Sequence, residues 1–373
     1  MALQNMKKNV IIFRNSFLEK LVMHYVNPVI KNFLRTSQPE DRAGYLRLDQ
    51  NENPDGVPKW LFRKAMKKIT PSYLSLYPEE IRFTTKYARL LGLEYENVTL
   101  TDGSVVAMGY VVKVFGEAGK KMLCVTPTFG MYKVYADMQQ MDTEFVHYEN
   151  DYTFNIDKLI ERIDSQTGIV SIVNPSMPIG NIYLQQDIER VVEKAQSVHA
   201  LVIIDEAYHY FYEKDSLALI RKYNNVVILR TFSKFLSIPA LRMGVVISTK
   251  DNVQYIKNYK PHYTVNGVAI AFGEAIVDNF DRVHKELQKS FCEGKQFLLN
   301  ALNNMAYSYI PTQGCFICIR PKNRTAEEIT EALKARGILI FCGKGDSAGF
   351  LRVTIWNKRH MKCFVEALKE VDR

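Results

Sequence analysis

Lys234 and Arg242 stand eight residues apart in TFSKFLSIPALRMG, shortly after VVILR, an apolar run typical of a strand. A second such run, LVIID, ends on the carboxylate of Asp205. A neutral lysine attacks carbonyl carbons, and an arginine binds phosphate or carboxylate through paired hydrogen bonds. Each residue alone has an ordinary explanation, as a solvated cation or as a carboxylate that caps the next helix. Only their arrangement with other motifs favours a function.

A third strand candidate, within NVTLTDGS (97–104), ends in Gly103 and Ser104 before the helical stretch VVAMGYVVKVF. The first turn of a helix offers unpaired backbone N–H groups to an anion. Parallel strands bring their carboxyl ends to one edge of the sheet, where open α/β sheets bind ligands. We therefore expect an amine, a carboxylate and an anion-binding loop at one sheet edge.

The elements that must position these residues alternate along the chain as short apolar strands and longer amphipathic helices, which predicts an α/β fold with a mainly parallel sheet. Near residue 280 the pattern changes to long charged helices and a few strands. We expect residues 48–280 to form a large domain, 281–373 a smaller C-terminal α+β domain, and 1–47 an N-terminal arm or part of the small domain. Strands are expected at 122–127, 169–175, 201–206, 225–231 and 243–249, and a helix at 184–199.

Composition narrows the class of protein. A chain of 373 residues that is 47% hydrophobic can bury more than one core. No apolar run is long enough to span a membrane, and the run before Arg14 is too short for a secretion signal, so we expect a cytoplasmic protein. The net charge is +9, but the basic residues are scattered among acidic ones. This pattern favours an enzyme with anionic substrates over a nucleic-acid or membrane binder.

Several kinds of site are disfavoured. The six cysteines are too sparse for a disulfide framework, and Cys315 and Cys318 should point to opposite faces of a strand. The seven histidines show no ligand spacing, so no metal is expected. The glycine-rich motifs of nucleotide-driven and nicotinamide enzymes are both missing from the sequence.

The ordered motifs LDQNENP, LSLYPEE, TDGS, TPTFGMY, NPSMPIGN, DEAYHYF, TFSKFLSIPALRMG and FLRVTI resemble those of the histidinol-phosphate aminotransferase family, within the fold-type-I pyridoxal-phosphate enzymes. The resemblance covers nearly the whole chain from residue 45. It implies a large cofactor-binding domain with a mainly parallel sheet, a small C-terminal domain, pyridoxal 5′-phosphate as cofactor, and transfer of amino groups.

The resemblance also implies roles for the residues that hold the cofactor ring. Lys234 fits the position that bonds covalently to the cofactor aldehyde and then moves a proton, and burial should lower its pKa toward the neutral form. Asp205 would keep the pyridine nitrogen protonated, which makes the ring an electron sink. Tyr208 would bond the ring oxygen, and Phe129 would stack on the ring, although a core aromatic explains Phe129 equally simply.

Other positions match the phosphate and substrate sites of the family. Tyr77 would reach the phosphate in the neighbouring subunit, which implies a homodimer with shared active sites. Arg352 would grip the carboxylate of an amino-acid donor such as glutamate, with an outer-face strand arginine as the alternative. The phosphate of the cofactor itself would be held by Gly103, Ser104, Val105, Thr231, Ser233 and Arg242.

Some positions depart from the family pattern. Met177 stands where the family has an asparagine that bonds the ring oxygen, so one such bond is missing. Ile238 and Pro239 are closer to the related phosphothreonine decarboxylases. We therefore expect an aminotransferase that acts on a small, phosphorylated carbonyl compound, with a decarboxylase of an O-phospho-amino acid as the alternative. A catalytically impaired protein with a binding or regulatory role is the third possibility. The joint retention of five residues argues against it: Lys234, Asp205, Tyr208, Arg242 and Arg352.

Overall fold

The computed structural model describes residues 24–32, 41–212 and 214–373, which fall into two units, Met1–Asp41 and Arg42–Arg373. The described part of the first unit contains a short helix, α2 (Pro28–Asn32), before which the side chain of Asn27 accepts a hydrogen bond from the Val29 N–H at 2.9 Å. Most of the predicted N-terminal arm therefore lies outside the described residues. All that follows concerns the second unit.

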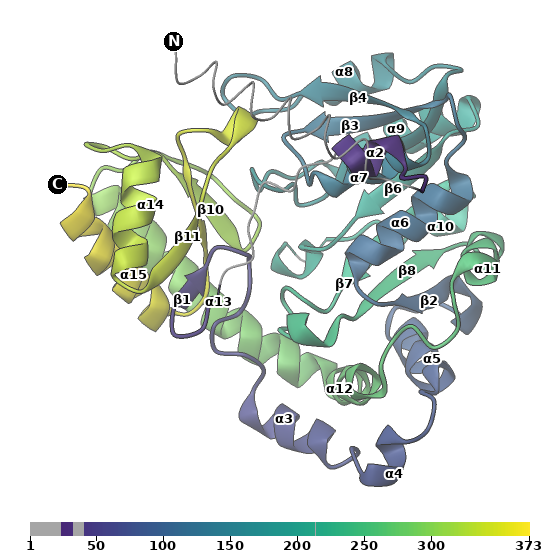
Figure 1. The fold of residues 1–373 in the computed structure, drawn as a ribbon, viewed down its shortest axis with the longest axis horizontal. Coiled ribbons are helices and arrows are strands. Elements are labelled where there is room, and N and C mark those ends of the chain that lie inside the picture. Colours follow the sequence, from purple (N-terminus) through teal and green to yellow (C-terminus); the bar gives the residue numbers. More distant parts are fainter. Residues whose placement is uncertain (1–23, 33–40, 213) are drawn as a thin grey trace. The chain divides into compact units, whose positions relative to one another are not determined.

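The larger sheet has the order β2-β8-β7-β6-β5-β3-β4. Strands β4, β3, β5, β6 and β7 are mutually parallel, and β8 runs antiparallel between β7 and β2. The mainly parallel sheet is thus confirmed (Figure 1). The strands are β2 (Val98–Thr101), β3 (Lys121–Thr126), β4 (Asp142–His147), β5 (Thr167–Val173), β6 (Leu201–Asp205), β7 (Val226–Thr231) and β8 (Gly244–Ser248).

Both faces of this sheet are covered, which is why its central strands read as continuous apolar runs. Ile203 and Ile204 are neighbours on β6 and pack into two different core clusters, because successive side chains of a strand point to opposite faces. The cluster that contains Ile204 also contains Val353 of the smaller sheet, so the two sheets share a continuous core.

Helices occupy the connections between these strands. The predicted helix at 184–199 is α9 (Gln185–Ser197), and it buries Ile188, Val191, Val192 and Ala195, which are the residues whose spacing predicted it. The other helices of this part are α3 (Lys59–Met66), α4 (Pro71–Leu74), α5 (Glu80–Leu90), α6 (Ser104–Phe115), α7 (Met131–Met138), α8 (Ile156–Glu161), α10 (Leu219–Lys222), α11 (Lys250–Tyr259) and α12 (Gly267–Val277).

The smaller sheet has the order β1-β11-β12-β10-β9, and β1 pairs with β11 in parallel while the other pairs are antiparallel. Its strands are β1 (Leu46–Leu48), β9 (Tyr309–Ile310), β10 (Phe316–Ile319), β11 (Ile338–Cys342) and β12 (Leu351–Thr354). Three helices lie beside it, α13 (Phe280–Asn304), α14 (Ala326–Ala335) and α15 (Lys358–Val371) (Figure 1). The chain thus enters this sheet through β1, passes through the larger sheet and returns.

Within the described residues, no helix combines the length and the apolar character that crossing a membrane requires. Nor do three or more His, Cys, Asp or Glu side chains of that part of the chain gather in a way that could hold a metal ion. Cys315 and Cys318 pack into different hydrophobic clusters, as expected of residues on opposite faces of a strand.

Candidate active site

Lys234 lies in the loop that follows β7. Its Nζ donates a hydrogen bond to the backbone carbonyl of Gln50 at 2.8 Å, and no carboxylate among the described residues lies within ion-pair distance. Burial is the main cause that lowers the pKa of Lys234 below its usual value, and the nearby guanidinium of Arg352 lowers it further. Burial thus shifts Lys234 toward the neutral form of the amine, which is the nucleophilic one.

Asp205 ends the neighbouring strand β6 and is buried. The Tyr132 hydroxyl donates to its Oδ2 at 2.9 Å, and the backbone N–H of Ala207 donates to its Oδ1 at 3.0 Å. Burial raises the pKa of Asp205, whereas the hydrogen bond from Tyr132 lowers it. Tyr132 belongs to the TPTFGMY motif, but nothing in the sequence pairs it with Asp205.

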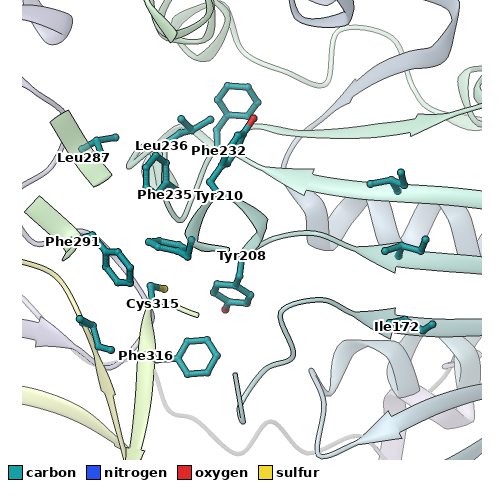
Figure 2. Packing of buried hydrophobic residues seen from close by; sticks show 14 of the residues in the cluster. Ile172, Tyr208, Tyr210, Phe232, Phe235, Leu236, Leu287, Phe291, Cys315 and Phe316 are labelled. Carbon is teal, nitrogen blue, oxygen red and sulfur yellow. The ribbon is translucent and has the colours of Figure 1, made fainter. Parts of the chain in front are cut away.

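Tyr208 is buried three residues after Asp205. Its hydroxyl accepts a hydrogen bond from Nδ2 of Asn51 at 2.9 Å. Its ring meets the ring of Phe316 edge to face at 5.2 Å, with Cys315 nearby (Figure 2). Because burial raises the pKa of Tyr208, the phenol keeps its proton and remains a hydrogen-bond donor.

The anion-binding loop predicted at 101–104 lies against Arg242. Gly103 adopts φ 101°, and a Cβ there would lie 2.5 Å from a guanidinium nitrogen of Arg242, so only glycine allows this approach. Arg242 Nη1 lies 3.5 Å from the Ser233 hydroxyl, and the Thr231 hydroxyl accepts a hydrogen bond from the Ser233 N–H at 3.1 Å. Helix α6 begins at Ser104, so the N–H groups of Ser104 and Val105 lie in its first turn. The structure thus gathers the predicted phosphate-binding residues.

Arg352 lies on β12 and is 9% exposed. Its Nη2 donates to the Asp49 carbonyl at 2.8 Å, its Nη1 lies 3.2 Å from the Met177 sulfur, and its Nε has no hydrogen-bond partner. The guanidinium lies 4.2 Å from the ring centre of Phe341. A buried cation with an unused donor and no carboxylate among the described residues is suited to an anionic ligand.

Two predicted residues stand apart from these contacts. Tyr77 is 76% exposed and stacks on Tyr263, with ring centres 4.6 Å apart. Phe129 packs against the cluster that contains Tyr132, which leaves the core-aromatic interpretation open. A cavity of about 630 Å³ is lined by three of the predicted site residues, Ser233, Lys234 and Arg242. Its other lining residues are Tyr45, Leu46, Arg47, Gln50, Glu52, Asn53, Pro54, Pro239, Ala240 and His360.

Residues 43–368 match the family described as aminotransferase class I and II. The chain belongs to this family. A histidinol-phosphate aminotransferase of Carboxydothermus hydrogenoformans is 29% identical, covering 91% of this chain and 96% of the relative. The crystal structure of histidinol-phosphate aminotransferase from Sinorhizobium meliloti in complex with pyridoxal-5′-phosphate has a TM-score of 0.83 at 22% identity, covering 94% of this chain and 98% of that one. L-threonine-O-3-phosphate decarboxylase from Porphyromonas gingivalis has a TM-score of 0.75 at 20% identity, covering 87% and 98%.

As a class I and II aminotransferase, the protein is a pyridoxal-phosphate-dependent enzyme with a fold-type-I architecture. The fold, the enzyme class and the cofactor predicted from the sequence are thereby confirmed. Sequence reasoning missed Asn51 and Tyr132, which contact two of the predicted site residues directly.

Proposed function

We propose that the enzyme moves an amino group from an amino-acid donor, L-glutamate in the first instance, to a small phosphorylated carbonyl compound. The observation that carries this proposal is the approach of Lys234 and Arg352 to neighbouring carbonyls, those of Gln50 and Asp49. A reactive amine thus lies near a buried guanidinium that lacks a carboxylate. An amino acid needs both groups, one at Cα and one at its carboxylate.

The residues present fit pyridoxal phosphate. The Arg242 guanidinium packs directly against Gly103, where a Cβ would clash with it, and this brings a cation beside the first turn of α6. Such a loop suits a phosphate, with donors from Ser104, Val105, Thr231 and Ser233. In the same proposal Asp205 would bind the ring nitrogen, Tyr208 would bind the ring oxygen and Phe129 would stack on the ring. When bound, the cofactor supplies an electron sink for the negative charge that develops at the substrate Cα.

The chain itself supplies proton transfer and orientation. Lys234, whose pKa is lowered by burial, would remove the proton from the substrate Cα and would return a proton at the end of the transfer. Arg352 binds the carboxylate through its planar fork and so fixes the Cα–H bond relative to Lys234. A phosphorylated acceptor is supported by the names of the relatives and by Arg47, a cation in the wall of the cavity.

We also propose a cytoplasmic homodimer in which Tyr77 reaches the cofactor phosphate of the partner subunit. Apolar residues exposed at and after α4 support this, because a cluster of this kind is typical of an interaction surface. These residues and their exposed fractions are Leu74 (63%), Leu76 (72%), Tyr77 (76%) and Ile81 (58%), with Tyr263 (54%) stacked on Tyr77. The division into domains 1–47, 48–280 and 281–373 remains part of the proposal, although β1 crosses the first boundary.

The test is an absorption spectrum of the purified protein with pyridoxal phosphate, followed by addition of L-glutamate. We expect a cofactor band that moves to the shorter wavelength of the pyridoxamine form and that is lost in Lys234→Ala. A band that glutamate leaves unchanged would contradict glutamate as the donor. Release of carbon dioxide from an O-phospho-amino acid would instead support the decarboxylase that Ile238 and Pro239 favour. A protein that forms no band would contradict the catalytic proposal.

A further inference from the structure

Three consecutive residues after β1 each contact a different residue of the proposed site. The Asp49 carbonyl accepts a hydrogen bond from Arg352, and the Gln50 carbonyl accepts one from Lys234, both at 2.8 Å. Asn51 uses its side chain instead, and its Nδ2 donates to the Tyr208 hydroxyl at 2.9 Å. Of the three, Asn51 is the one whose side chain makes the contact.

Asn51 is held tightly in an uncommon conformation. It is 4% exposed, and its φ of 58° lies in the left-handed region, which asparagine tolerates better than most residues. Its backbone N–H donates to the Thr354 hydroxyl at 3.0 Å, two residues beyond Arg352 on β12. A buried side chain at a strained position is retained only where the surroundings determine it.

The hydrogen bonds of Thr354 fix the orientation of the Asn51 amide. Because the Thr354 hydroxyl accepts from the Asn51 N–H, its own proton is free to face Oδ1 of Asn51, which lies 3.5 Å away. Nδ2 must then face Tyr208. An inverted amide would place a carbonyl oxygen against the phenol and take up its proton.

The Tyr208 proton is therefore left for another acceptor. Asp205, Arg352 and Cys315 are the titratable groups that face Tyr208, and among the described residues none accepts its hydrogen bond. Met177 adds no donor here, because a thioether has no proton to donate and its sulfur contacts Arg352. In the proposed function, Tyr208 would then supply the hydrogen bond to the cofactor ring oxygen on this side of the site.

We propose that Asn51 is a positioning residue that directs the Tyr208 hydroxyl proton at the ring oxygen of bound pyridoxal phosphate. This inference rests on the proposed function, in which Tyr208 faces that oxygen. Asn51 acts through Tyr208 and touches neither substrate nor cofactor.

Asn51→Gly is the sharpest test, because glycine adopts a positive φ without strain and the substitution removes only the side chain. The readout is the pH midpoint at which the absorption band of the bound cofactor changes colour. A donor to the ring oxygen stabilises its negative charge, which is greatest in the deprotonated chromophore, so weakening the donor raises the midpoint. A hydrogen bond of ordinary strength corresponds to a rise of about 0.5 to 1 pH unit.

Tyr208→Phe should raise the midpoint further, and adding Asn51→Gly to it should change nothing more, because both act on one hydrogen bond. If Asn51→Gly does not fold, Asn51→Asp serves in its place. Its carboxylate would take the Tyr208 proton, so the midpoint should again rise. A midpoint equal to that of the wild type in the variant that folds, with only the melting temperature lowered, would overturn the inference and leave the proposed function intact. The assigned site itself would be overturned if the wild-type protein showed no band that titrates with pH. It would also be overturned if Tyr208→Phe left the midpoint of that band unchanged.

Discussion

Two buried arginines of this protein differ in whether a carboxylate neutralises them. Arg230, at the end of β7, has a side chain that is 2% exposed and pairs with Glu206 at 2.8 Å and with Asp215 at 3.0 Å. Arg352, on β12, is nearly as buried but contacts one carbonyl, one sulfur and two aromatic rings. The first guanidinium is neutralised by two carboxylates of the fold. The second pairs with no carboxylate among the described residues, and the proposed function assigns it to the substrate. The comparison thus contrasts an arginine that is paired within the fold with one that the proposed function uses to bind substrate.

The largest expected effect is on stability. Arg230→Met should lower the free energy of unfolding by about 3–5 kcal/mol, because it leaves Glu206 as a buried carboxylate without its partner. Urea unfolding measures this. Arg190→Met is the matched control, since Arg190 pairs with Asp157 and Asp187 at the surface and should cost at most about 1 kcal/mol. Equal losses of unfolding free energy in the two variants would contradict the structural role assigned to Arg230.

Arg352→Leu should affect catalysis instead. We expect kcat/KM for the amino-acid donor to fall roughly 100-fold, because the substrate carboxylate loses a buried cation. The free energy of unfolding should change little, because no buried carboxylate is left unpaired. Arg320→Leu is the control, since Arg320 lies over the ring of Phe350 at 4.6 Å but is exposed. A large loss of stability without a loss of kcat/KM would assign Arg352 to the fold.

The smallest expected effect concerns Asp205, a buried carboxylate, and not an arginine. Tyr132→Phe removes one of the two donors to Asp205, so the pKa of Asp205 should rise and its hold on the protonated ring nitrogen should weaken. We expect the Kd for pyridoxal phosphate to increase roughly 5- to 10-fold, measured by titrating the apoprotein. Tyr135→Phe, on the same helix, should bind the cofactor like the wild type. An unchanged Kd in Tyr132→Phe would show that the Ala207 N–H alone is sufficient.

The positions of Asp205 and Lys234 could be predicted from the sequence because each follows an apolar strand, and parallel strands end at a common edge. The antiparallel direction of β8 could not, because a strand pattern carries no orientation. Nor could the contacts of Asn51 and Tyr132, since they join segments far apart in the chain and depend on the angle of single side chains. The same holds for Met177, whose contact with Arg352 bridges a loop of the larger sheet and a strand of the smaller one.

The parallel pairing of β1 with β11 has a consequence for biosynthesis. Leu46–Leu48 leave the ribosome early, but their partners Ile338–Ile340 are translated near the end. Until then, residues 49–51 have no sheet to anchor them beside the catalytic groups. The strands of the larger sheet are all translated before β11, whereas the proposed site is complete only when the C-terminal strands have been released. A product truncated before β11 should therefore be unable to bind its substrate.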